Sequence, residues 1–280
     1  MSSYLKFCDT IESYEDAKYV ILGVPFDSTV SFRPGEKLAP NAIRQASYNA
    51  ESLVLRKKFN LKEALVYDMG DLDETHDSEE MIDAVYSEVD GIVSDGKFPI
   101  LLGGEHSISI GAIKRIKKKV LFIDAHTDFR NSYMGNIYSH ASVARRAADI
   151  VGKNNILSVG IRSVSKEEID VGTQDYISSY DFKWKRELSI KKIKDFSSSD
   201  LYFSIDVDGI DPAYAPGVGT PEPFGLSSWD MLEIIDLISN KIIALDVVEI
   251  TPLFDNGNTA FLAARLIQEI IASRESSYEK

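Results

Sequence analysis

Short, uninterrupted apolar runs alternate with longer amphipathic segments through most of this chain. The runs are rich in β-branched and aliphatic residues and occupy residues 19–26, 64–72, 99–104, 119–126, 156–163, 201–208 and 242–250. Continuous runs of this kind are typical of parallel strands that are buried on both faces. The amphipathic segments between them predict crossover helices, so we expect a doubly wound α/β fold with a parallel sheet. No Pro-, Gly- or Ser-rich linker divides the chain, which predicts one domain over residues 1–280.

The composition limits the classes of partner. The 280 residues carry a formal net charge of −13, and the sequence pI is near 4.8. Phosphate binding needs a basic face, so this balance argues against a nucleic-acid partner.

Cys8 is the single cysteine, which excludes an internal disulfide and fits a reducing compartment. The N-terminal segment lacks an apolar signal core and no apolar run could span a bilayer, so we expect a soluble, cytoplasmic protein without a membrane partner.

Two carboxylates and an imidazole occupy alternate positions at the end of one predicted strand. They are Asp124, His126 and Asp128 in the segment LFIDAHTDFR. Side chains at alternate positions of a strand point to the same face. Without a counter-charge, this crowding costs free energy through desolvation and like-charge repulsion. We therefore expect a cation among them.

Polar side chains also lie at the ends of two other predicted strands, and the carboxyl ends of parallel strands share the edge where ligands bind. The six candidate metal ligands are His106 in GGEHS, Asp124, His126 and Asp128, and Asp206 and Asp208 in SIDVDG. Their formal charge of −4 matches two divalent cations, and six ligands are too many for one tetrahedral zinc. Nitrogen and oxygen ligands without a thiolate favour Mn²⁺ over Fe, Co or Zn. Two such ions can share a bridging hydroxide, which is a strong nucleophile near neutral pH.

Each cluster has a simpler interpretation when it is taken alone. His106 after a Gly-Gly turn would more often be a structural histidine, and the DxHxD segment alone is compatible with a single metal site or a strand end that faces solvent. Asp206 and Asp208 are also suited to capping a turn, because GIDP follows them. The coincidence of all three clusters at predicted strand ends favours the dinuclear metal site.

Five segments of the chain resemble signature elements of the ureohydrolase family, which includes arginases, agmatinases and guanidinobutyrases. GGEHS resembles the family's GGDHS element, DAHTD its DAHxD element, and SIDVDGIDPAYAPGVGTPEPFG its long third element. GVPFDSTVSFRPGEKLAPNAIR resembles the N-terminal segment of agmatinases, and DVVEITP the segment that carries the family's catalytic glutamate. The resemblance spans nearly the whole chain. It implies a three-layer α/β/α fold with a central parallel sheet, as in arginases and deacetylases, and assembly as homotrimers or homohexamers.

The resemblance also implies roles for individual residues. One Mn²⁺ would be held by His106, Asp124, Asp128 and Asp206, and a second by Asp124, His126, Asp206 and Asp208. Glu249 would bind the guanidinium of the substrate. Asp128 would accept a proton or a hydrogen bond from the hydroxide, and His140 would shuttle a proton or contact the substrate. The implied reaction is hydrolysis of a guanidino group to urea and an amine by a hydroxide bound to two manganese ions.

Agmatine, which would yield putrescine and urea in polyamine biosynthesis, is the substrate that the resemblance favours. Arginine, guanidinobutyrate and aminopropylagmatine stay open, because one side-chain change at a pocket mouth can switch between them. A metal-dependent deacetylase of acyl-amines is a more distant alternative. Glu105 stands where the family usually has Asp, and Ala141 where it usually has Gly. We expect the longer Glu105 to alter the support around His106 and Ala141 to alter the turn after His140.

Overall fold

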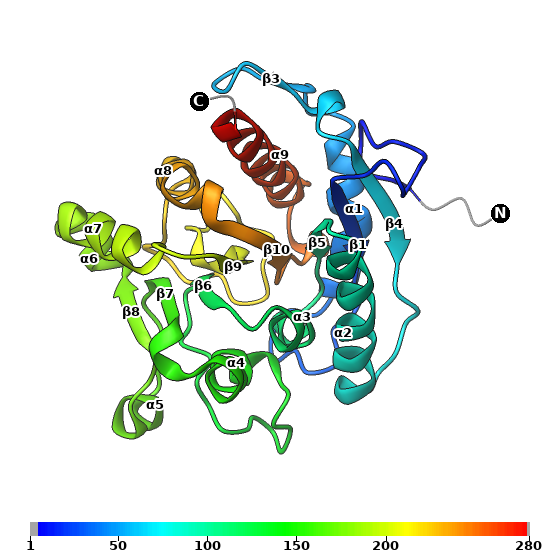
Figure 1. Ribbon diagram of the computed structural model, residues 1–280. Coiled ribbons are helices and arrows are strands. Elements are labelled where there is room, and N and C mark those ends of the chain that lie inside the picture. Colours follow the sequence, from blue (N-terminus) through cyan, green and yellow to red (C-terminus); the bar gives the residue numbers. More distant parts are fainter. Residues whose placement is uncertain (1–4, 279–280) are drawn as a thin grey trace.

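The structure is a computed structural model that describes residues 5–278. Its centre is a sheet of eight parallel strands in the order β4-β1-β5-β10-β9-β6-β7-β8 (Figure 1). In that order the strands are Val66–Asp71, Tyr19–Gly23, Phe98–Leu102, Ile242–Val248, Leu201–Asp206, Lys119–Ile123, Ile156–Ile161 and Asp175–Ser178. A short antiparallel pair, β2 (Leu53–Val54) and β3 (Phe59–Asn60), lies outside this sheet.

Helices cover both faces of the sheet. One face carries α1 (Ala39–Ser47), α6 (Ser179–Trp184), α7 (Arg186–Phe196), α8 (Ser228–Ile238) and α9 (Asn258–Tyr278). The other face carries α2 (Ser78–Ser94), α3 (Ser109–Ile116) and α4 (Val143–Val151). The short α5 (Lys166–Val171) follows β7 at the periphery.

Alternate side chains of the strands supply two hydrophobic cores. Leu121 and Ile123 belong to the core beneath α8 and α9, whereas Val120 and Phe122 belong to the core beneath α3 and α4. Both sets are almost completely buried. Burial on two faces explains why each strand reads as an uninterrupted apolar run. The predicted three-layer α/β/α fold with a central parallel sheet is confirmed.

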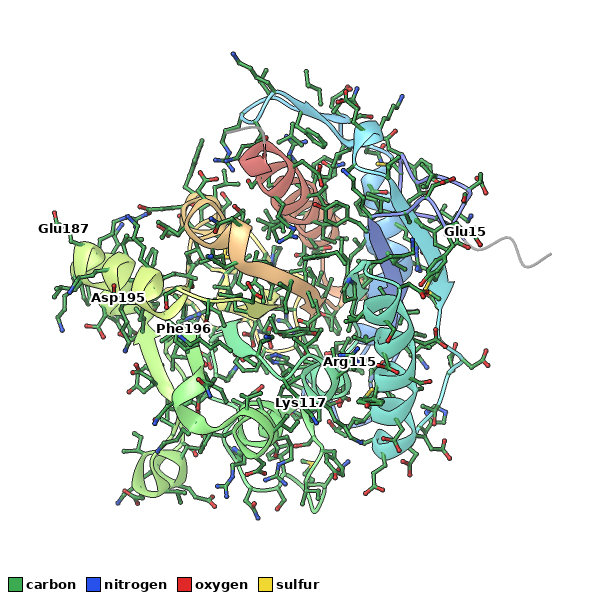
Figure 2. All side chains as sticks on the ribbon, viewed as in Figure 1. Glu15, Arg115, Lys117, Glu187, Asp195 and Phe196 are labelled. Atoms are coloured by element: carbon green, nitrogen blue, oxygen red, sulfur yellow. The ribbon has the colours of Figure 1, made fainter. Side chains whose placement is uncertain are left out.

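The prediction missed the elements of residues 175–196. These are the edge strand β8 and the helices α6 and α7, which bury few apolar side chains and expose Tyr180, Trp184 and Leu188. Glu187 and Asp195 are also exposed on α7 at the margin of the molecule (Figure 2). An element that buries only one narrow stripe has a weak apolar signal, which explains the omission. Within residues 5–278, no helix combines the length and the apolar composition that a membrane span requires.

The order of the strands determines where functional side chains can meet. The strands β5, β10, β9 and β6 are neighbours at the centre of the sheet. Asp206 is the last residue of β9, and the loops that follow the four strands carry His106, Glu249, Asp208 and the segment 124–128. Because all eight strands are parallel, these four loops emerge at the same edge.

Candidate active site

The six predicted metal ligands lie together at this edge, but strand alternation is not what brings them together. β6 ends at Ile123, so Asp124, His126 and Asp128 lie in the loop after the strand. β9 ends at Asp206, and Asp208 belongs to a 3-10 turn, Val207–Gly209. Asp128 adopts a left-handed backbone conformation with φ 48°. The carboxylates therefore converge through loop and turn geometry, which corrects the expectation of a shared strand face.

His106 faces three carboxylates. Its Nδ1 lies 3.4 Å from Asp124 Oδ2 and 3.2 Å from both Asp128 Oδ2 and Asp206 Oδ2. On the other side of the ring, Nε2 lies 3.1 Å from Ser204 Oγ, and the Ser204 hydroxyl donates to Asp246 Oδ1 at 2.6 Å. With its proton committed to Asp246, the hydroxyl accepts from Nε2–H of His106. This arrangement leaves the Nδ1 lone pair directed at the carboxylates.

His126 faces a second group of carboxylates. Its Nδ1 lies 2.9 Å from Asp208 Oδ2 and 3.7 Å from Asp124 Oδ1. Burial alone would lower the pKa of His126, but the Asp208 carboxylate beside it raises that pKa to about 10. Burial and the Asp128 charge raise the pKa of Asp124 to about 7. Without a metal, protons must therefore offset the negative charge of this cluster.

The donor set fits metal cations. His106 is about 1% exposed, and its Nδ1 has no hydrogen-bond partner among the described residues although three carboxylates surround it. Two groups of ligand atoms are each compact enough for one ion: His106, Asp124 and Asp128, and Asp124, His126 and Asp208. Asp124 belongs to both groups. Two cations that share Asp124 would supply the positive charge that these carboxylates lack.

Backbone amides hold the carboxylates in place. Asp124 Oδ1 accepts the N–H of His126 at 2.6 Å, and Asp206 Oδ1 accepts the N–H of Asp208 at 2.9 Å. Asp208 Oδ1 accepts the N–H of Ala125 at 3.0 Å, which ties the loop after β9 to the loop after β6. The second oxygens of Asp124 and Asp206 face His106, whereas Asp208 Oδ2 faces His126 and also accepts the Thr220 hydroxyl at 2.9 Å.

Glu249 links the cluster to the pocket above it. Its backbone is left-handed, with φ 65°, and its Oε1 accepts the N–H of His106 at 2.6 Å. Left-handed backbone at a residue other than glycine costs free energy and often occurs at functional sites. Glu249, Asp128, Asp206 and Asp208 line a cavity of about 250 Å³.

His140 lies on the wall of the same cavity and is held by Thr29, a residue that no sequence motif singled out. Its Nδ1 lies 3.1 Å from Thr29 Oγ1, which also accepts the N–H of His140 at 3.0 Å. The Thr29 hydroxyl donates to Glu105 Oε1 at 2.6 Å, and the Thr29 N–H donates to Glu105 Oε2 at 2.6 Å. Glu105 thus supports the loop that carries Thr29, and through it His140, instead of supporting the ring of His106.

A family of known proteins matches most of this chain. A model of the Arginase family matches residues 17–272. The chain belongs to the arginase family. Members of the family are metal-dependent hydrolases of guanidino C–N bonds, so the prediction of a hydrolase of that class is confirmed.

Individual relatives of this arginase-family chain match it over nearly its whole length. An agmatinase of Bacillus anthracis is 34% identical over 275 residues, which cover 95% of this chain and 94% of the relative. The N(1)-aminopropylagmatine ureohydrolase of Thermococcus kodakarensis is 37% identical over 264 residues, which cover 90% and 89% of the two chains. The crystal structure of agmatine ureohydrolase of Thermoplasma volcanium has a TM-score of 0.95 at 48% identity and covers 99% of this chain and 96% of that chain.

Proposed function

We propose that this chain hydrolyses agmatine to putrescine and urea at a pair of Mn²⁺ ions. The observation that carries the proposal is that His126, Asp128, Asp206, Asp208 and Glu249 line one cavity, with His106 and Asp124 buried in contact with them. The similarity of the chain to proteins named agmatinase and agmatine ureohydrolase supports the choice of agmatine as the substrate.

The six predicted ligands would hold the two ions, with Asp124 and Asp206 shared between them. Bound there, the ions would supply a nucleophile by lowering the pKa of a water molecule. A nitrogen and oxygen donor set without a thiolate supports manganese.

Glu249 would hold the substrate. A guanidinium is planar and permanently charged, and its N–H groups pair with a carboxylate in a fixed geometry. Glu249 Oε1 is engaged by the N–H of His106, which orients the carboxylate and leaves Oε2 for the substrate. This orientation would hold the guanidinium carbon over the cluster.

Asp128 and His140 would accept and donate protons during the reaction. Asp128 borders the cavity and is 8% exposed, so its carboxylate can accept a proton from the attacking water. Departure of the amine requires that its nitrogen be protonated. His140 lies in the cavity wall, and its Nδ1–H can donate to Thr29, which would leave Nε2 free to exchange a proton with the leaving amine.

Glu168 supports a substrate with a second positive charge. It lines the cavity, and hydrogen bonds from Ser165 and Thr127 outweigh burial and lower the pKa of its carboxyl. Arg130 Nε lies 4.0 Å from Glu168 Oε2, so the distal amine of agmatine would meet an ionised carboxylate that it shares with Arg130. Aminopropylagmatine is a second candidate, because the 37% identical relative bears its name.

Urea release tests the proposal. Mn²⁺-loaded protein would be given agmatine, arginine, guanidinobutyrate and aminopropylagmatine side by side, with a chelator-treated sample as control. We expect agmatine to be cleaved with a kcat/KM about tenfold or more above the others, a preference worth ~1.4 kcal/mol. Absence of urea from every substrate, despite bound metal, would contradict the proposal and favour a different C–N bond.

Thr29→Val tests the support of His140. The substitution keeps the side-chain shape but removes the hydroxyl between Glu105 and His140. We expect kcat to fall about tenfold with little change in KM, as for the loss of a residue that orients a reacting group. Thr29→Ser should retain activity, and Ser28→Ala, at the exposed neighbouring position, is the matched control. Wild-type kcat in Thr29→Val would rule out this support.

A further inference from the structure

One carboxyl in the cavity wall has no role in the proposed reaction. Glu36 begins a 3-10 turn (Glu36–Leu38) in the loop between β1 and α1, directly after Gly35, whose φ is 124°. The side chain borders the same cavity as Glu249 and is about 1% exposed. Its Oε2 has no hydrogen-bond partner among the described residues. A buried carboxyl oxygen left in this state is costly, so a missing partner is indicated.

The surroundings of Glu36 make a cation the fitting partner. The nearby charges of Asp27 and Glu105 are both negative, and burial raises the pKa of Glu36 to about 8. Arg33, in the same loop, makes no salt bridge with Glu36 within residues 5–278, and its guanidinium lies over the rings of Phe32 and Phe254. Among residues 5–278, no lysine, arginine or histidine therefore forms a salt bridge with this carboxyl.

Glu36 and Glu249 approach the same point of the backbone from different loops. A Cβ atom built on Gly219 would lie 2.8 Å from Glu36 Oε1 and 3.6 Å from Glu249 Oε2. Gly219 lies in the segment GVGTPEPFG, and it also borders the cavity. The absence of a side chain at this position keeps the space beside the two carboxylates open.

We infer that Glu36 is a second guanidinium-binding carboxylate that acts together with Glu249. This inference rests on the proposed function and adds a specificity residue to it. A monosubstituted guanidinium offers five N–H donors, so one edge of the fork can face Glu249 while another faces Glu36. Two carboxylates favour the charged substrate over urea, which has nearly the same shape but no charge. The pair thus binds the substrate and releases the neutral product.

Guanidinium and urea form the matched probe pair for this inference, because their binding does not require turnover. Their dissociation constants would be measured by calorimetry on Mn²⁺-loaded wild type, Glu36→Gln, Glu36→Asp and Asp27→Asn, with sodium chloride matched to the guanidinium chloride. Asp27→Asn removes one of the negative charges near Glu36 without altering the cavity wall, so it separates the effect of nearby charge from the loss of the Glu36 carboxylate itself. The KM and kcat for agmatine would be measured in parallel.

We expect Glu36→Gln to weaken guanidinium binding about tenfold or more while urea binding changes by less than about threefold, since only a charge-assisted contact is lost. The KM for agmatine should rise together with the dissociation constant for guanidinium, and kcat should change less. Glu36→Asp should retain part of the preference for guanidinium, and Asp27→Asn nearly all of it.

Other results would overturn the inference. It fails if Glu36→Gln keeps the wild-type ratio of the two dissociation constants, or if both ligands weaken equally, because Glu36 would then only shape the cavity. Wild-type protein that binds metal but not guanidinium would contradict both this inference and the proposed function. A wild type that does not cleave agmatine, but whose preference for guanidinium is lost in Glu36→Gln, would contradict only the proposed substrate.

Discussion

Asp206→Asn and Asp124→Asn should each abolish tight binding of at least one metal ion and lower kcat/KM by about a thousandfold or more, equivalent to ~4 kcal/mol. Both carboxylates are buried, and each lies within 3.4 Å of His106 Nδ1. In the proposed mechanism each of these carboxylates would bind both ions. Replacing either one with a neutral amide would therefore weaken both metal sites. Metal content by mass spectrometry and urea release from agmatine are the two measurements.

The fold should survive these substitutions. An asparagine Oδ1 can still accept the N–H of His126 at position 124 or of Asp208 at position 206. Circular dichroism and the melting temperature of metal-free protein would therefore match the wild type. Asp200→Asn is the control. Asp200 is exposed and directly precedes β9, at the edge of the sheet opposite to the one where Asp206 ends that strand. An Asp206→Asn variant with wild-type activity would contradict the dinuclear assignment.

Glu249→Gln should lower kcat/KM for agmatine by about a hundredfold, or ~3 kcal/mol, which is the range for losing a charged hydrogen bond in a buried site. Glutamine can keep the acceptor that faces the N–H of His106, but it then presents an amide N–H₂ to the substrate. A donor would oppose the N–H groups of the guanidinium. Initial rates over a range of agmatine concentrations would separate the effects on kcat and KM.

Metal content is the internal control for Glu249→Gln, because Glu249 is not one of the predicted ligands. We expect the variant to bind the same amount of Mn²⁺ as the wild type. Activity within a few-fold of wild type, with metal bound, would rule out Glu249 as the residue that grips the guanidinium.

The sequence was a good guide to the sheet and a poorer guide to where its strands end. The runs that continue through Asp124 and Asp206 looked like longer strands, because polar residues at alternate positions preserve the periodicity of a strand. In the structure the chain leaves the sheet at Ile123 and Asp206. The edge strand β8 escaped notice for the opposite reason, since Asp175 and Tyr176 are exposed and its apolar pattern is short.

The cluster of six candidate ligands could be anticipated, because each residue lies at the end of an apolar run that identifies its strand or within a few residues of that end. Parallel strands share one carboxyl edge, so residues after several strands meet whatever the details of the loops. His140, Thr29 and Glu105 differ in this respect. Their contacts join positions 76 and 111 residues apart, and nothing in the local pattern around Thr29 distinguishes it from other loop residues.

The sequence alone therefore determined the class of fold, the edge of the sheet that carries the site, and the charge that a cation must balance there. Each of these follows from short-range periodicity or from residue type. Only the tertiary structure decided that Glu36 lies beside Glu249 with an unpartnered oxygen, and that Glu105 supports Thr29. Those relationships depend on the backbone conformation of loops and on packing between distant segments, which local pattern does not encode.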